Sequence, residues 1–160
     1  MSCMTKVTLA PDDELHDALR RFVIENARLD LAVARRHEIS LADLHALDHL
    51  EFSGGLTPGQ LGTQLGLTSG AVTALADRLE RLGLLQRKPH TTDRRSTVLC
   101  LTELAEGFAE DAYASFGEDM SAAAAELSAR DQRTVAAFLE RAAEIAAAHV
   151  ARQLGDAPAA

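Results

Sequence analysis

The stretch from residue 56 to residue 101 constrains the fold most, because two helix-start signals follow each other closely within it. Thr57, Pro58 and Gln60 have the types and the spacing of a helix N-cap, a first helical position and a capping box. Gly66 is a typical helix stop, so this first helix is short. Thr68 then begins a second helix after a turn of about four residues. Two helices joined in this way predict a helix-turn-helix, whose second helix lies in a DNA major groove.

A β-hairpin is predicted directly after the second helix. One apolar stripe of that helix is spaced for burial, and its members are Val72, Leu75, Leu79 and Leu82. Gly83 ends the helix, residues 84–88 and 96–101 have the composition of two strands, and residues 89–95 form a charged turn between them. Leu56 is a candidate for one short strand beside this hairpin. A hairpin in this place is called a wing, and its basic tip can reach phosphates or the minor groove.

At this point the sequence resembles the MarR-type regulators (multiple antibiotic resistance regulators). The family pattern joins a recognition helix ending in Asp-x-Leu-x-x-x-Gly-Leu to a basic residue, an Asp-Arg-Arg wing and a Leu-Thr pair. The matching residues are Asp77, Leu79, Gly83, Leu84, Arg87, Asp93, Arg94, Arg95, Leu101 and Thr102. The resemblance implies a mainly α fold with a small β-wing (α+β), a winged helix-turn-helix with N- and C-terminal dimerisation helices.

The expected organisation is one domain, residues 1–160, that contains a winged helix-turn-helix DNA-binding lobe at residues 40–101. Residues 11–38 and 102–154 are the expected dimerisation helices. The last of these helices has an apolar face formed by Val135, Phe138, Leu139, Ala142, Ile145, Ala146 and Val150. The residues alone show surplus apolar surface at both ends of the chain, and the resemblance implies that a second subunit covers it. A monomer whose two ends pack on each other is the alternative.

The chain has a net charge of −8, which at first argues against DNA binding. The distribution of charge reverses this expectation, because six basic residues and only two acids lie between Arg78 and Arg95, a local net charge of +4. A basic patch on an acidic body suits a protein that neutralises phosphates with one surface and repels nonspecific DNA elsewhere. A solvated charged face is the alternative explanation.

The predicted DNA contacts lie on the exposed face of the second helix and on the hairpin. They are Ser69, Gly70, Thr73, Ala74, Arg78, Arg87, Lys88, Arg94 and Arg95. Backbone N–H groups in the first turn favour a phosphate, and Thr73 can contact a base edge. Arg78 is expected at a phosphate or base, with a surface ion pair as the alternative.

Asp77 has no direct role at DNA, because a carboxylate is repelled by phosphate. The resemblance implies that Asp77 pairs with a wing arginine, with Arg94 as the first choice, and so fixes the wing against the helix. Arg95 is then free to enter the minor groove, although the two arginines can exchange these roles. A local pair with Arg81 is the alternative.

Enzyme chemistry is not predicted, because the sequence has no nucleophile elbow, no phosphate-binding glycine loop and no cofactor fingerprint. No cofactor is expected for DNA binding. His45 and His49 have a spacing that can bind zinc, but two ligands do not make a stable site, so no metal is assigned. Cys3 and Cys100 are too few for a disulfide framework, and the sequence does not decide whether either senses redox conditions.

A small organic effector, aromatic or anionic, is implied by the resemblance, in a cleft between the dimerisation helices and the DNA-binding lobe. His16, Arg20, His45 and His49 are the candidate lining residues, chosen because they lie on the first two predicted helices. No run of 18 apolar residues and no signal-peptide pattern is present, so we expect a cytoplasmic protein that is not in the membrane.

The function expected from these features is sequence-specific binding of double-stranded DNA by a transcriptional regulator. The expected mode is repression by a homodimer at a pseudo-palindromic operator, modulated by a small ligand. The alternatives are a redox- or metal-responsive regulator of the same fold and a protein-interaction module that has lost DNA recognition.

Overall fold

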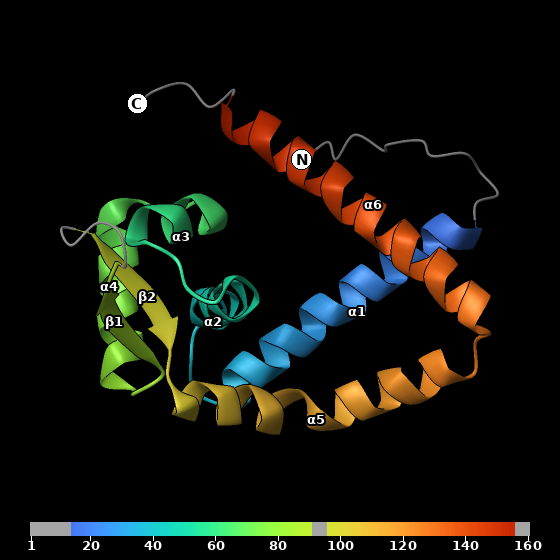
Figure 1. Cartoon of the computed structure of the whole chain (residues 1–160), viewed down its shortest axis with the longest axis horizontal. Coiled ribbons are helices and arrows are strands. Elements are labelled where there is room, and N and C mark those ends of the chain that lie inside the picture. Colours follow the sequence, from blue (N-terminus) through green and yellow to red (C-terminus); the bar gives the residue numbers. More distant parts are fainter. Residues whose placement is uncertain (1–13, 91–95, 156–160) are drawn as a thin grey trace, which may run out of the picture.

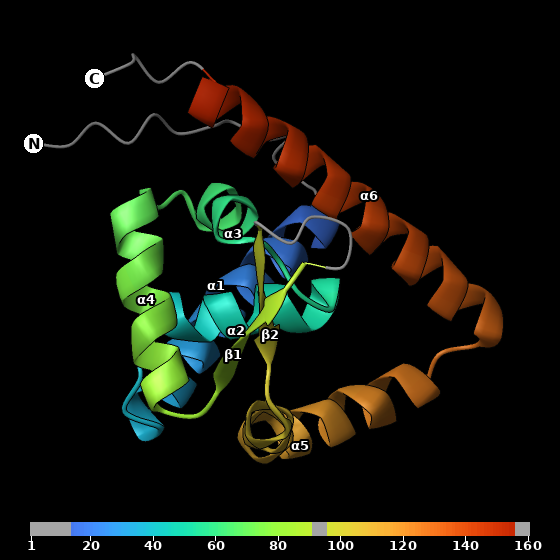
Figure 2. The same ribbon diagram turned by 60° about the vertical axis from the view of Figure 1, so that its left-hand side comes forward.

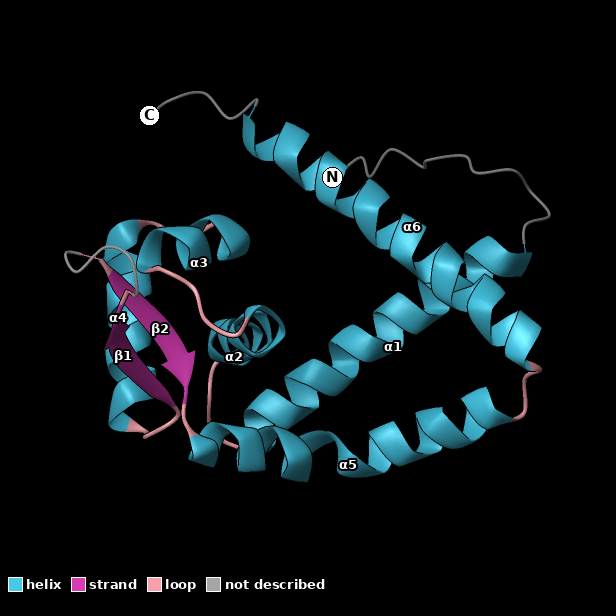
Figure 3. Ribbon diagram, viewed as in Figure 1, coloured by secondary structure: helices cyan, strands magenta, loops and turns pink. Residues whose placement is uncertain are grey.

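The computed structural model describes residues 14–90 and 96–155, which form six helices and two strands within these ranges (Figure 1). In chain order the elements are α1 (Glu14–Arg36), α2 (Leu41–Ser53), α3 (Pro58–Leu65), α4 (Ser69–Arg81), β1 (Leu85–Pro89), β2 (Thr97–Leu101), α5 (Glu103–Ala125) and α6 (Ala129–Gly155). The predicted fold class, mainly α with a small β-wing, is confirmed (Figure 3). No helix in these ranges is long and apolar enough to cross a membrane.

The molecule has a compact lobe from which three long helices extend. Helices α2, α3 and α4 and the β1–β2 hairpin form the lobe (Figures 1 and 2). Helix α1 leads into it and α5 leads out of it. Helix α6 then turns back and crosses the N-terminal part of α1.

Side-chain caps explain where the lobe helices begin. The Thr57 hydroxyl accepts the Gln60 N–H at 3.3 Å, and the Gln60 side chain accepts the Thr57 N–H at 2.9 Å. This is the predicted capping box at the start of α3. Thr68 caps α4 by accepting the Ala71 N–H at 3.4 Å, so both predicted start signals are confirmed.

The core of the lobe contains apolar side chains from every one of its elements. Its buried members are Ala46, Leu47, Leu50, Leu61, Val72, Leu75, Ala76, Leu79, Leu84, Leu85, Leu99 and Ala105. The predicted buried stripe of α4 is wrong at one position, because Leu82 is 49% exposed. Helix α4 ends at Arg81 and Leu82 is its C-cap, so the chain leaves the helical path there, and Ala76 completes the buried face instead.

The hairpin pairs β1 with β2 in antiparallel register, from Leu85 opposite Leu101 to Pro89 opposite Thr97. Leu56 joins this sheet through an isolated bridge to Leu99, in which each N–H donates to the other residue's carbonyl, at 3.0 and 2.7 Å. The predicted short strand at Leu56 is therefore confirmed. It ties the segment between α2 and α3 to the base of the wing.

Replacing Gly55 by Ala should destabilise the lobe by about 1–3 kcal/mol, the usual cost of a strained backbone conformation. Gly55 has a φ of +134°, and an added Cβ would lie 3.0 Å from Val98 Cγ1 and 3.2 Å from the Leu99 carbonyl oxygen. Thermal and urea unfolding measure the loss. Gly59→Ala is the matched control, because no atom lies within 4 Å of its added Cβ. Equal stability of the two variants would contradict this account of Gly55.

Candidate nucleic-acid interface

Helix α4 lies at the outer edge of the lobe (Figures 1 and 2). Its apolar face is buried in the core, so its polar face is directed outward. The exposed residues of that face include Ser69, Gly70, Thr73, Ala74 and Asp77. Every one of these was predicted to lie on the exposed face.

The first turn of α4 borders a shallow cleft of about 480 Å³ shared with α3. Ser69 and Thr73 line this cleft together with α3 residues. The Thr73 hydroxyl donates to the Ser69 carbonyl at 3.0 Å, which leaves its oxygen lone pairs and its methyl group for other contacts. Gly70 has no neighbour within 4 Å of an added Cβ, so packing within the described fold does not require a glycine there.

Arg78 forms an ion pair with Asp43 of α2. Its Nε lies 2.9 Å from Asp43 Oδ2 and 3.1 Å from Oδ1, and its Nη2 also donates to Oδ1. The Asp43 side chain is 1% exposed and that of Arg78 is 42% exposed. Burial alone would raise the pKa of Asp43, but hydrogen bonds from Arg78 and Ser40 outweigh burial and lower this pKa.

Arg87 of β1 bridges two carboxylates on α4. Its Nη2 lies 2.6 Å from Asp77 Oδ1, and its Nη1 donates to Glu80. Arg94 lies outside the described residues, as does the predicted Asp77–Arg94 pair. The alternative partner, Arg81, donates from Nε to the Asp77 backbone carbonyl rather than to its carboxylate.

The remaining predicted wing contacts are Lys88, Arg94 and Arg95. Lys88 alternates with Arg87 along β1, so the two side chains lie on opposite faces of the hairpin. Lys88 lines a cleft of about 950 Å³ between α2, the hairpin and α5, together with Cys100 and Glu106. Arg95, like Arg94, lies outside the described residues.

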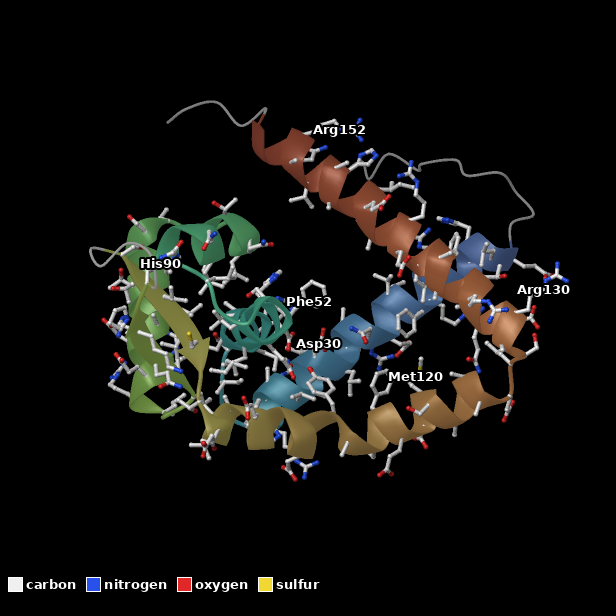
Figure 4. The ribbon with its side chains drawn as sticks, viewed as in Figure 1. Asp30, Phe52, His90, Met120, Arg130 and Arg152 are labelled. Atoms are coloured by element: carbon white, nitrogen blue, oxygen red, sulfur yellow. The ribbon has the colours of Figure 1, made fainter. Side chains whose placement is uncertain are left out.

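The predicted effector residues are not gathered at one place. His45 Nε2 lies 3.9 Å from Asp30 Oδ2, near the inner end of α1 (Figure 4). His16 precedes Asp30 by fourteen residues on the same helix, which is roughly 21 Å along its axis. Neither the 950 Å³ cleft nor the apolar cleft described below is lined by His16, Arg20, His45 or His49.

A polar cluster at the junction of α1, α2 and α5 was not found from the sequence. The Tyr113 hydroxyl donates to Asp30 Oδ1 at 3.0 Å, and burial together with this hydrogen bond raises the pKa of Tyr113. Burial and the nearby charge of Asp30 raise the pKa of Asp48. These residues lie on three different helices, so their spacing in the sequence carries no signal.

Metal binding and thiol chemistry were the other possibilities raised by the sequence. Within residues 14–90 and 96–155, no group of three or more His, Cys, Asp or Glu side chains is arranged to hold a metal ion. Cys100 has a free, half-buried thiol in β2. Cys3 lies outside the described ranges.

An outward helix of a helix-turn-helix beside a β-hairpin defines the winged helix-turn-helix class of proteins. A family model described as MarR family matches residues 37–96. The HTH-type transcriptional regulator YcgE of Bacillus subtilis (strain 168) is 32% identical over 103 residues, which are 64% of this chain and 67% of that protein. The chain belongs to the MarR family of winged-helix transcriptional regulators, which are not enzymes.

Two solved structures, both of S. aureus MepR mutants, share this fold. A mutant of MepR from a multidrug-resistant S. aureus clinical isolate gives a TM-score of 0.70 at 21% identity, covering 83% of this chain and 97% of that one. A second S. aureus MepR mutant, solved bound to an oligodeoxyribonucleotide, gives a TM-score of 0.55 at 21% identity, with 83% and 98% covered. These likenesses confirm the fold.

Replacing Asp43 by Asn should lower the free energy of unfolding by about 2 kcal/mol at pH 7, because a buried charge pair is broken. The folded-state pKa of Asp43 is depressed, so its stabilisation is present above the unfolded pKa of about 3.9 and is lost as pH falls through the folded pKa. Urea unfolding between pH 7 and pH 2.5, at one protein concentration, should therefore show the two proteins converging in acid.

The control for this titration is Glu144→Gln, which alters an exposed acid paired with Arg141 on α6. It should track the wild type across the same pH range. A difference between wild type and Asp43→Asn that stays constant down to pH 2.5 would contradict the assigned role of the Asp43 carboxylate.

Proposed function

We propose that this MarR-family chain binds double-stranded DNA sequence-specifically as a homodimer and represses transcription by occupying a pseudo-palindromic operator. The observation that carries the proposal is the outward face of α4, which is made of small and polar side chains while its opposite face is buried in the lobe core. Such a helix can enter a major groove without exposing the core. The oligodeoxyribonucleotide bound by the structurally similar S. aureus MepR mutant supports this mode.

The proposed contacts divide between backbone positioning and base recognition. The exposed first turn of α4, at Ser69 and Gly70, offers backbone N–H groups to a phosphate. Thr73 and Ala74 follow one turn later, where they reach base edges. The absence of any packing reason for Gly70 supports a close approach of DNA at that position.

The basic residues of the hairpin supply phosphate and minor-groove contacts in this proposal. Arg94 stays the proposed wing partner of Asp77, and Arg95 stays the proposed minor-groove contact. Arg87 contributes to the field at the phosphates while its guanidinium holds Asp77 and Glu80. Lys88, on the other face of the hairpin, acts at longer range.

The dimer is proposed from apolar surface that one chain leaves uncovered. From residue 129 to residue 153 of α6, all residues except Ala142 are exposed, and Ala142 is only half-buried. An apolar cleft of about 400 Å³ lies between α1, α5 and α6, where Met120 of α5 projects toward α1 (Figure 4). Phe52, 97% exposed, projects from α2 on the side that faces α6. A second copy related by a two-fold axis buries such surface and presents two α4 helices to one duplex.

The proposed regulator responds to a small organic effector. The cleft of about 950 Å³ lies where α2, the hairpin and α5 meet, so a bound ligand there contacts both the lobe and a proposed dimerisation helix. A ligand that favours a spacing of the two lobes different from the DNA-bound spacing lowers DNA affinity by linkage. This cleft is proposed as a ligand site beside the residues chosen from the sequence, His16, Arg20, His45 and His49, which do not line it.

Selection of duplexes from a random DNA library at physiological salt tests the proposed function. The wild type should enrich a palindrome whose half-site centres lie about 10–10.5 base pairs apart. The double variant Arg94→Ala/Arg95→Ala should lose this enrichment, because it removes the charges at the wing tip. The control is Arg130→Ala/Arg133→Ala, which removes the same charge from the beginning of α6 and should keep the enrichment. Figure 4 shows Arg130 at the far end of the molecule from α4. No enrichment by a folded wild-type dimer would refute DNA recognition and favour a protein-interaction module.

The dimer is tested by two matched substitutions on α6. Ala146 lies on the apolar face, and Ala137, nine residues earlier, lies two and a half turns away on the opposite face. Ala146→Glu places an unpaired charge in the proposed interface and should weaken the dimer tenfold or more, about 1.4 kcal/mol. Ala137→Glu should leave it intact. Sedimentation velocity across a dilution series measures both, and identical assembly of the two variants would contradict the proposed interface.

A further inference from the structure

We infer that Arg78 is a positioning residue rather than a DNA contact, and that it sets the orientation of α4 through the buried carboxylate of Asp43. This inference rests on the proposed DNA recognition by α4. It changes the role that the sequence suggested for Arg78 and adds Asp43, a residue on α2, to the determinants of recognition.

The first support is the burial of the acceptor. Asp43 is the one charged residue that is fully buried within the described parts of the chain. Its carboxylate receives Nε and Nη2 of Arg78, and the Ser40 N–H and hydroxyl donate to Oδ2 at 3.0 and 2.7 Å. If Arg78 turned away to bind a phosphate, the carboxylate would lose its charged partner inside the core. The cost of such an uncompensated charge exceeds the gain from one solvent-exposed phosphate contact.

The second support is the position of Arg78 along α4. It is the tenth of thirteen residues, so it lies about 14 Å along the axis from Ser69 at the N-terminal end. The N-terminal residues of a recognition helix make the base contacts, so Arg78 lies at the end that does not. An anchor at this end controls the angle at which the other end enters the groove.

The third support is a second anchor on α4. Arg87 of β1 holds Asp77 and Glu80, while Arg78 holds Asp43 of α2. Adjacent helical residues point about 100° apart, so Asp77 and Arg78 project from α4 in different directions. Asp77 pairs with β1 and Arg78 pairs with α2. Rotation of α4 about its axis would stretch both ion pairs. The two anchors together fix which side chains face the DNA.

Ser40 extends the arrangement toward α1. It caps α2 and lies four residues after the last residue of α1, and its two donors share Oδ2 of Asp43 with Arg78. Both Ser40 donors belong to the capping box of α2, so they hold the Asp43 carboxylate in the orientation in which it receives Arg78.

The test compares Asp43→Asn, Arg78→Lys, Arg78→Gln and the double variant Asp43→Asn/Arg78→Gln. Each is titrated with the duplex that the wild type enriches and with a scrambled duplex, at three salt concentrations. A positioning role predicts that all three single variants lose about tenfold affinity for the enriched duplex, and that the double variant is no worse than the singles because the residues act as one unit. Lysine fails here because it lacks the planar fork of arginine. Affinity for the scrambled duplex and the salt slope should stay unchanged.

A direct phosphate contact predicts the opposite pattern and would overturn the inference. Asp43→Asn would then release Arg78 and leave binding unchanged or tighter, and Arg78→Lys would bind nearly as the wild type does. Arg78→Gln would weaken both duplexes and reduce the salt slope by about one.

Val33→Ala controls for simple loss of stability and should keep discrimination between the duplexes. Val33 is buried in the cluster that it forms with Ala34 and Leu44, which includes no residue of α4 or of the hairpin. Loss of discrimination by this control would also overturn the inference. If Asp43→Asn fails to fold, Arg78→Lys and Arg78→Gln decide between a positioning role and a phosphate contact. The Arg78 side chain is partly exposed, so these two variants should fold. A wild type that enriches no duplex refutes the proposed function itself, an outcome distinct from either pattern.

Discussion

Burial of one face of α4 determines which side chains of this helix are left outside. Val72, Leu75 and Leu79 pack into a core built from α2, α3 and the hairpin, and the small and polar residues on the other face then point outward. Apolar packing alone tolerates small rotations, because it is not directional. The ion pairs of Arg78 with Asp43 and of Arg87 with Asp77 and Glu80 are directional, and they restrict the helix to one orientation.

The distribution of apolar surface links this lobe to assembly. The lobe buries its own core, whereas the apolar side chains of α6 stay about half exposed in a single chain, with Phe138 at 37% and Ile145 at 48%. A second copy that packs on α6 buries its apolar surface and also doubles the number of recognition helices. In the proposed regulator, α5 belongs to the dimerisation helices and also lines the cleft of about 950 Å³. A ligand bound in this cleft therefore contacts a helix that helps to set the spacing of the two lobes.

The sequence predicted the local features of the fold and missed the distant pairs. The caps at Thr57 and Thr68 depend on residues three positions along the chain, and both are confirmed. Asp43 and Arg78 are 35 residues apart, so only the packing of α2 against α4 brings them together. The same applies to Tyr113 and Asp30 on α5 and α1. Long-range polar contacts follow from the packing of helices, which hydrophobic periodicity does not specify.

Hydroxyl-radical footprinting of the wild-type protein on its enriched duplex tests the central claim most directly. A homodimer with two outward α4 helices predicts two protected patches on one face of the duplex, with centres about one helical turn apart, 34–36 Å. The stoichiometry should be two chains per duplex. A single protected patch, or uniform protection along the whole duplex, would contradict the account of a dimer that recognises two half-sites.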